Sequence, residues 1–267
     1  MKIWIITSNF DQLSLFKFLN KYDFEYHILR DWNNWPYWDK DLEYNLHNIQ
    51  AWIDFLKKKK VDYIILPPIY ELYSNDNKIL PLFTTYLEWA LQKSLVGKIW
   101  FVWDFADIHV IEKTFFDLAK NYELTSNQQK IEKFHYPFSV RKKETTLWKF
   151  YLYKLWFRDH MIRDTIKNDL KYFKDANVDT IIPLNRWYLF FENIIKSKLN
   201  LKKQKFHWTK FVQWCFENLV DLTLQEKYEV TIYPNGTPDF LLKEKKRLWM
   251  LERGKTISAA IDLESHL

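Results

Sequence analysis

The stretch Asp179-Thr-Ile-Ile-Pro-Leu-Asn-Arg-Trp-Tyr-Leu-Phe-Phe191 decides the fold. Its β-branched start is typical of a buried strand, and apolar residues then recur at helical spacing as far as Leu199. A second segment of the same form, Val61-Asp-Tyr-Ile-Ile-Leu-Pro-Pro-Ile-Tyr-Glu71, also runs from Val-Asp through a strand into a turn. Ligands of open α/β sheets bind where strands end and turn into helices. Both turns are therefore candidate parts of a functional site.

Strands and helices alternate along the rest of the chain, which predicts α/β architecture with parallel sheets. The pattern restarts after Gly97, so the sequence indicates two similar halves. The predicted strands cover residues 3–7, 26–29, 61–66, 99–103, 130–136, 178–182 and 229–233, with one more near 206. The predicted helices cover residues 12–20, 41–59, 80–94, 108–121, 145–175, 238–250, the segment after 187 and the segment around 215.

The composition excludes several classes of protein. Hydrophobic residues make up 48% of the 267 residues and charged residues 28%, which are values of a globular chain rather than a disordered one. Only three Gly are present, so a Gly-rich loop that cradles phosphate is ruled out. Aromatic residues are abundant, with 14 Trp, 16 Tyr and 21 Phe. Some of this excess is expected from mutational drift in an AT-rich genome.

Cysteine and histidine usage predicts neither a metal site nor a cofactor. The single cysteine, Cys215, excludes a disulfide framework and any Cys-based metal site, and its apolar helical surroundings predict an inert core thiol. The seven histidines show no metal-ligand spacing. The N-terminal apolar run lacks a cleavage site, and no stretch reaches the ~20 apolar residues of a membrane span. We therefore expect a cytoplasmic protein.

The net charge of +6 raises the question of nucleic-acid binding. Basic clusters occur at residues 57–60, 141–143, 202–205 and 243–247. Lysines at helix ends and in loops commonly serve as solvated surface that also complements the helix dipole. We therefore expect no nucleic-acid partner, although the sequence leaves open whether these clusters make such a contact.

Six short motifs, in the same order and at similar spacing, resemble those of the glutamate racemase family within the aspartate/glutamate racemase superfamily. They are Ile5-Ile-Thr-Ser-Asn9, Asp31 with Pro36-Tyr-Trp38, Pro67-Pro-Ile-Tyr70, Asp104-Phe-Ala-Asp107, Asp179–Tyr188 and Ile232-Tyr-Pro-Asn-Gly-Thr-Pro-Asp-Phe240. The resemblance implies two similar parallel-sheet α/β domains of the aspartate/glutamate racemase type. It assigns residues 1–96 and 209–267 to the first domain and residues 97–208 to the second, with a cleft at their interface.

The resemblance does not extend to the catalytic residues. Racemases of this family use two cysteines as bases, one on each face of the substrate α-carbon, and these positions fall on Pro68 and Asn185. Proline has no titratable group, and an amide is not a base near pH 7. Cys215 matches neither position. The sequence therefore predicts a degenerate member of the family that lacks both catalytic cysteines.

The turns at strand ends offer polar residues that could form a ligand-binding cleft: Ser8, Asp31, Tyr37, Tyr70, Asp104, Asp107 and Arg186. Arg186 could hold a carboxylate in a bidentate pair. In the competing interpretation, which we favour, Asp104 caps a helix, Asp107 lies in its first turn and Arg186 pairs with one of them. Large aromatic residues at these turns would then fill a former cleft.

Two hypotheses of function follow. The first is a catalytically inactive, glutamate-racemase-like pseudoenzyme that serves as a structural or regulatory subunit, through contacts with a protein partner or a second copy of itself. The aromatic helix at residues 146–157 is the candidate interface because it is apolar on more than one face. The alternative is a remodelled enzyme or binder that takes a small anionic ligand, a carboxylate, in the cleft.

Overall fold

The fold is described from a computed structural model. It describes residues 1–7, 15, 24–31, 37, 40–94, 97–103, 108–125, 139–145, 147–148, 151, 160–175, 178–199, 211, 214–215, 218, 229–235 and 255–258. The chain divides into two compact units: Met1–Leu82 with Val212–Leu267, here called the first unit, and Phe83–Phe211, here called the second unit. The predicted domain boundaries near residues 96 and 209 stay a proposal.

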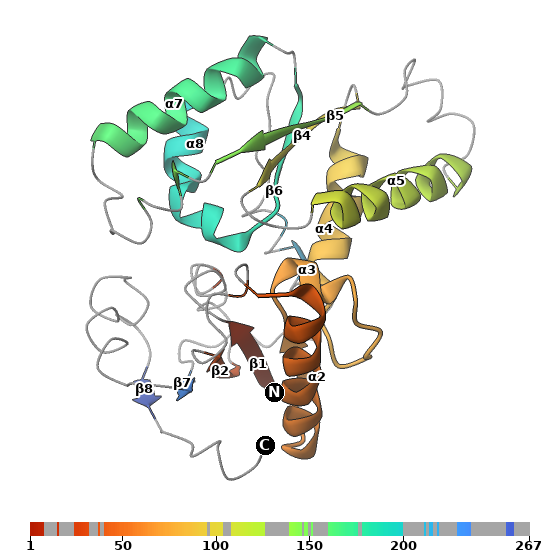
Figure 1. Cartoon of the computed structure of the whole chain (residues 1–267), viewed down its shortest axis with the longest axis vertical. Helices are drawn as coiled ribbons and strands as arrows, with labels where there is room; N and C mark the ends of the chain where they lie inside the picture. Colours follow the sequence, from red (N-terminus) through yellow and green to blue (C-terminus); the bar gives the residue numbers. More distant parts are fainter. Residues whose placement is uncertain are drawn as a thin grey trace. The chain divides into compact units, whose positions relative to one another are not determined.

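The first unit contains a five-stranded parallel sheet (Figure 1). Its strands are β1 (Lys2–Thr7), β2 (Glu25–Asp31), β3 (Tyr63–Ile65), β7 (Glu229–Asn235) and β8 (Lys255–Ser258), in the order β3-β1-β2-β7-β8. Every pair of neighbouring strands is parallel. Because parallel strands finish at the same edge, the residues that follow β1, β2, β3 and β7 are brought to one side of this sheet, here called the carboxyl edge.

Helix α2 (Leu42–Lys58) covers this sheet and supplies much of its core. Asp41 caps its start, since the carboxylate accepts a hydrogen bond of 2.8 Å from the backbone N–H of Glu43. The predicted apolar stripe is confirmed at Ile49, Ile53 and Leu56, which are buried against residues of β1 and β3. The short helix α3 (Pro68–Glu71) follows β3 at the carboxyl edge.

The second unit repeats the arrangement on a smaller scale. Its parallel sheet has the order β5-β4-β6, formed by β4 (Lys98–Trp103), β5 (Ser139–Glu144) and β6 (Thr180–Pro183). Its helices are α4 (Leu82–Lys93), α5 (Ile108–Thr125), α7 (His160–Asp175) and α8 (Glu192–Lys198), with a 3-10 helix, η4, at Arg186–Phe191. The predicted α/β class with two parallel-sheet domains is confirmed.

Hydrogen bonds place the two Val-Asp segments in the same register of their sheets. The backbone N–H of Asp62 donates to the carbonyl of Lys2 at 3.1 Å, and the backbone N–H of Asp179 donates to the carbonyl of Lys98 at 3.1 Å. Lys2 and Lys98 each begin a Lys-Ile-Trp sequence, at the start of β1 and β4. The predicted similarity of the two halves therefore extends to individual positions.

The Asp of this repeat is exposed in one unit and buried in the other. In the first unit the carboxylate of Asp62 accepts a hydrogen bond of 2.8 Å from the backbone N–H of Lys2, at the surface. In the second unit Asp179 is 4% exposed and accepts bonds of 2.9 and 3.1 Å from the hydroxyl of Ser94. Ser94 in turn accepts a bond of 3.1 Å from the N–H of Gly97, which has a positive φ of 69°.

Several predicted elements differ from the structure or lie outside its described residues. The strand predicted at residues 130–136 falls outside them, and the strand of this region is β5, at Ser139–Glu144. The helix predicted at 145–175 is described at 147–148, 151 and 160–175. The segments predicted at 12–20, near 206 and at 238–250 lie almost wholly outside, and β8 was not predicted. No helix in the described part of the chain has the length and apolar character to cross a membrane.

Candidate functional site

The carboxyl edge of the first unit brings together three of the residues predicted as a ligand site. Asp31 is the last residue of β2, and Tyr70 lies on α3 just after β3. Tyr37 lies between these two residues in the sequence and is buried. The phenol of Tyr37 donates a hydrogen bond of 2.9 Å to Oδ2 of Asp31. The rings of Tyr37 and Tyr70 meet edge to face, with centroids 5.4 Å apart. These three side chains form one cluster.

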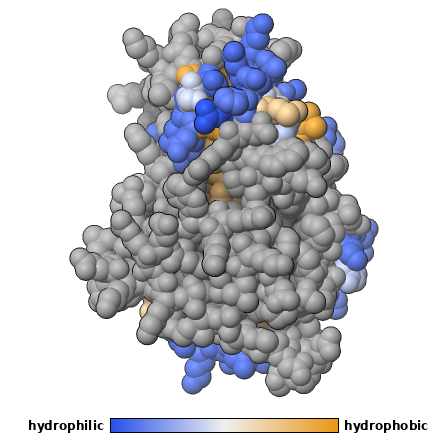
Figure 2. Space-filling model, turned by 90° about the vertical axis from the view of Figure 1, so that its left-hand side faces the viewer, coloured by the Kyte–Doolittle hydropathy of each residue, from blue (hydrophilic) through white to orange (hydrophobic). Residues whose placement is uncertain are grey.

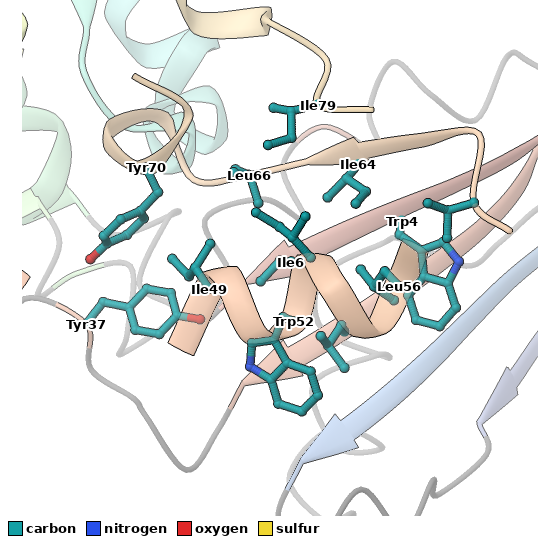
Figure 3. Packing of buried hydrophobic residues seen from close by; sticks show 13 residues of the cluster. Trp4, Ile6, Tyr37, Ile49, Trp52, Leu56, Ile64, Leu66, Tyr70 and Ile79 are labelled. Carbon is teal, nitrogen blue, oxygen red and sulfur yellow. The ribbon is translucent and has the colours of Figure 1, made fainter. Parts of the chain in front are cut away.

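This cluster is closed to solvent. Asp31 is 0% exposed, Tyr37 is 4% exposed and Tyr70 is 6% exposed. Both tyrosines belong to the same hydrophobic cluster as residues of α2, β1 and β3, and Figure 3 shows them side by side at one end of it. The two rings therefore occupy space at the edge where a ligand would sit in an open sheet of this class.

Burial also controls the acid–base chemistry of the two phenols. Desolvation raises the pKa of Tyr37 well above its ordinary value, and the neighbouring carboxylate of Asp31 raises it further. Desolvation raises the pKa of Tyr70 as well, although the nearby amide of Asn45 partly opposes this shift. Both phenols therefore stay protonated near neutral pH, and neither serves as a base.

Sequence reasoning missed two buried polar residues at this edge. Asn45, which is 1% exposed on α2, donates from Nδ2 to the carbonyl of Tyr37 at 2.6 Å and so fixes the segment that carries this ring. Its position within the apolar stripe, three residues after Leu42 and four before Ile49, was the available signal. Glu71, which is 5% exposed on α3, adds a second buried carboxyl group.

In the second unit, the turn after β6 carries Asn185 and Arg186. Asn185 is half-buried at the start of η4, and Arg186 is 0% exposed. A guanidinium stays protonated in proteins, so burial at this position requires partners within the protein. Arg186 is therefore part of the packed interior of the turn rather than a group presented to solvent.

A hydrogen bond joins the ends of two strands of this sheet. The hydroxyls of Thr145, which follows β5, and Tyr188, on η4, are hydrogen-bonded to each other. The ring of Tyr188 also meets the indole of Trp148 edge to face, with centroids 5.7 Å apart. These contacts hold the turn after β6 against the end of β5. Sequence reasoning did not single out either hydroxyl.

The remaining predicted site residues are placed as follows. Ser8, Asp104 and Asp107 lie outside the described residues, so the expected pairing of Arg186 with one of the aspartates is untested. Pro68 is the first residue of α3 and is buried. Cys215 is a buried free thiol, as predicted. Within the described ranges, no three His, Cys, Asp or Glu side chains gather in a group that could hold a metal ion.

Two units of parallel α/β structure, each presenting a carboxyl edge, define the class of fold. No protein-family model matches the sequence, and no curated protein matches it. Solved structures do match over nearly the whole chain. Glutamate racemase from Campylobacter jejuni is similar with a TM-score of 0.71 and 16% identity, over 95% of this chain and 100% of that one.

Two further glutamate racemases show the same likeness. The enzyme from Francisella tularensis in complex with D-glutamate has a TM-score of 0.68 and 16% identity, over 99% of this chain and 98% of that one. The Escherichia coli enzyme, in complex with L-glutamate and the activator UDP-MurNAc-Ala, has a TM-score of 0.56 and 12% identity, over 97% and 98%. At such low identity, the likeness establishes the glutamate racemase fold and nothing of the chemistry.

Proposed function

We propose that the protein is a catalytically inactive relative of glutamate racemases, and that it serves as a structural or regulatory subunit through contacts with other proteins. The single observation that carries this proposal is the pair of residues at equivalent turns of the two units. Pro68 lies six residues after Asp62, and Asn185 lies six residues after Asp179. Because the two aspartates share one register, Pro68 and Asn185 stand at corresponding positions.

This correspondence supports the proposal independently of the family motifs. A racemase that removes a proton from one face of an α-carbon and returns it on the other needs two bases at matching places. The internal repeat places Pro68 and Asn185 at such matching positions. Proline has no titratable group, and the side chain of asparagine is an amide. Neither is a base at neutral pH.

The packing of the first unit supports the same conclusion. Tyr37 and Tyr70 fill the carboxyl edge and are 4% and 6% exposed, and their burial keeps both phenols protonated. Buried aromatic rings contribute strongly to the stability of a core. A protein that has lost its ligand but kept its fold is expected to have aromatic rings in the former ligand site.

A role in protein contacts draws its support from the segment after β5. Trp148 is 0% exposed and Tyr151 is 8% exposed, whereas Leu147, between Thr145 and Trp148, is 61% exposed. The inward residues anchor this segment in the second unit, and Leu147 presents an apolar side chain to solvent. Aromatic side chains are enriched in interface cores, and the sequence of residues 146–157 is rich in them. We propose this segment as part of the contact surface.

A specific observation keeps the remodelled-site alternative open. Two carboxyl groups, Asp31 and Glu71, are buried at the carboxyl edge of the first unit, with 0% and 5% exposure. A buried carboxylate needs a compensating partner, which either a ligand or a structural hydrogen-bond network supplies. In this alternative the protein binds a small carboxylate and Arg186 holds it.

Thermal unfolding with and without glutamate separates the two proposals. A ligand present at 100 times its Kd adds about 2.7 kcal/mol to stability, which gives a readily measured rise in Tm. We expect no rise with L-glutamate, D-glutamate or other small carboxylates. A concentration-dependent rise that is lost in Arg186→Lys, a variant that keeps the positive charge but not the planar fork, would favour the alternative.

Sedimentation of the purified protein tests the contact role. We expect self-association or a stable complex with a protein from the source cell, which is weakened by Leu147→Glu. Met161→Glu is the matched control, because Met161 is 59% exposed on α7 and also lies in the second unit. A monomer at all concentrations that also forms no complex in the source cell would refute this part of the proposal.

A further inference from the structure

The net positive charge of the protein comes from one of its two units. The second unit contains 23 Lys and Arg against 14 Asp and Glu, a net charge of +9, whereas the first unit contains 17 against 20, a net charge of −3. Genome-wide drift towards lysine codons would act on both units alike. Such drift alone therefore does not account for the difference in net charge between the units.

Helix α7 carries four Lys or Arg against three Asp, a net charge of +1, and it aligns three of its cations on its outer face. Arg163, Lys167 and Lys171 are exposed and follow one another at intervals of four residues. At about 100° per residue, the three lie within an arc of roughly 80° and about 6 Å apart along the axis. No ion pair engages any of them within the described part of the chain. By contrast, Lys143 on β5 is held by Asp169 at 3.1 Å.

The acidic residues of α7 neutralise part of the charge of this helix. Asp169 is directed to the inner side, where it also accepts a hydrogen bond of 2.7 Å from the indole N–H of Trp148. Asp164 is exposed on the outer face, and Asp175, four residues after Lys171 at the end of α7, is the third acid of this helix. Figure 2 shows mainly hydrophilic residues, with some hydrophobic ones beside them, in the upper part of the view.

The opposite face of α7 decides which polyanion this stripe fits. Ile162, Ile166, Leu170 and Phe173 are all 0% exposed, because they pack in the core of the second unit. A helix that binds an anionic membrane inserts its apolar face into the lipid, and here that face is already buried. Only the outer face of α7, with its row of cations, is available for binding, and such a row fits the phosphates of a nucleic-acid backbone.

Contrary to the expectation drawn from the scattered basic clusters of the sequence, we propose that the stripe formed by Arg163, Lys167 and Lys171 is a binding surface for the phosphate backbone of a nucleic-acid duplex. Such binding is electrostatic and independent of base sequence, because Lys and Arg neutralise phosphates that every sequence presents alike. Each cation neutralises about one phosphate. This inference does not rest on the proposed function, because it involves neither the strand-end turns nor the segment around Leu147.

Fluorescence anisotropy with a labelled DNA duplex, measured across a salt series on the full chain, tests the proposal. A mixed-sequence duplex of about 20 base pairs is roughly 68 Å long and exceeds the roughly 24 Å length of α7. Each neutralised phosphate contributes a slope of about −0.9 to log K against log salt, so three contribute about −2.7. Affinity through the stripe should therefore fall about 40-fold when salt rises fourfold.

Two triple variants decide whether the stripe or the overall charge is responsible. In R163Q/K167Q/K171Q we expect the slope to become shallower by about 2.7 and the affinity at low salt to fall accordingly. The control K98Q/K113Q/K120Q removes three exposed lysines from β4 and α5 of the same unit. It should keep most of the slope. Circular dichroism and thermal unfolding confirm that both variants are folded.

Three results would overturn the proposal. The first is a wild-type affinity for the duplex that does not change with salt, or no binding at low salt. The second is an equal loss in the two triple variants, which would mean that net charge alone attracts DNA. The third is stripe-dependent binding to phosphatidylserine vesicles without binding to the duplex, which would assign the surface to membranes.

Discussion

Substitution of Tyr37 by Phe tests whether the carboxyl edge of the first unit is a packed core. The change removes one hydroxyl and keeps the ring, so the edge-to-face contact with Tyr70 is retained and no cavity forms. What is lost is the hydrogen bond of 2.9 Å from the phenol to Asp31. Both groups are buried, at 4% and 0% exposure, so solvent does not replace that bond.

The expected loss of stability follows from the charge of the acceptor. A hydrogen bond to a charged group contributes about 1.5–3 kcal/mol, and a buried acceptor that loses its donor also keeps the cost of desolvation. We therefore expect Tyr37→Phe to lower the free energy of unfolding by about 2–3 kcal/mol, measured by equilibrium unfolding in urea. Tyr44→Phe is the control, because Tyr44 is 47% exposed on α2, on the surface of the same unit. That variant should change stability by less than about 0.5 kcal/mol.

The pH dependence provides an independent check of the same contact. Burial and Asp31 raise the pKa of Tyr37 in the folded state, whereas the unfolded phenol ionises near pH 10. Because the folded-state value is the higher one, this stabilising contribution is complete below about pH 10 and is lost as pH rises towards the folded-state pKa. One such group lowers stability by up to about 1.4 kcal/mol for each pH unit above 10.

Tyr37→Phe removes this contribution, so above pH 10 the stability of the variant should fall less steeply than that of the wild type. The difference in slope should approach 1.4 kcal/mol for each pH unit. Equal slopes, or a loss of stability no larger than in Tyr44→Phe, would show that Tyr37 is exposed to solvent. The account of a filled edge would then be wrong.

Three further predictions concern other parts of the chain. Lys60→Gly should stabilise the protein by about 1 kcal/mol, because Lys60 has a positive φ of 56° at the end of α2, which glycine adopts more easily. Lys59→Gly is the control and should give no gain in stability, because Lys59 has a φ of −88°. Urea unfolding measures the stability of both variants. Asp179→Ala should lower the free energy of unfolding by about 3 kcal/mol and Asp62→Ala by less than about 1 kcal/mol, because only Asp179 is buried with its hydrogen-bond donor. Equal losses of stability would contradict the conclusion that Asp179 is buried and Asp62 is exposed. The thiol of Cys215 should react with a chromogenic disulfide reagent only as the protein unfolds, and rapid reaction of the native protein would show that it is accessible.

The sequence was most informative where one face of an element is buried. The apolar stripe of α2 and the two Val-Asp strands were predicted because burial imposes a period on the residues. The aligned Lys-Ile-Trp starts of β1 and β4 were also present in the sequence. They gain meaning only when hydrogen bonds show that the segments share a register.

The polar contacts were less predictable. That Asp31, Tyr37 and Tyr70 belong together was expected from the resemblance, but nothing in the sequence says that Tyr37 donates to Asp31 or that both are sealed from water. Such contacts depend on which rotamers the packing selects. Asn45 illustrates the problem, since its position in the apolar stripe indicates burial but does not identify its acceptor, the carbonyl of Tyr37.

The measurement that tests the central claim most directly is exchange of the α-proton of glutamate for solvent deuterium. Racemisation by two bases passes through loss of this proton, so exchange reports catalysis even when the net change in chirality is small. An active glutamate racemase provides the positive control, and the double variant Pro68→Cys with Asn185→Cys tests whether thiols at these positions restore exchange. The account predicts that the wild-type protein gives no exchange above the buffer background, with either enantiomer. Exchange above that background in the wild type, retained after Cys215→Ser, would show that other bases act in this fold and would contradict the claim that the racemase chemistry has been lost.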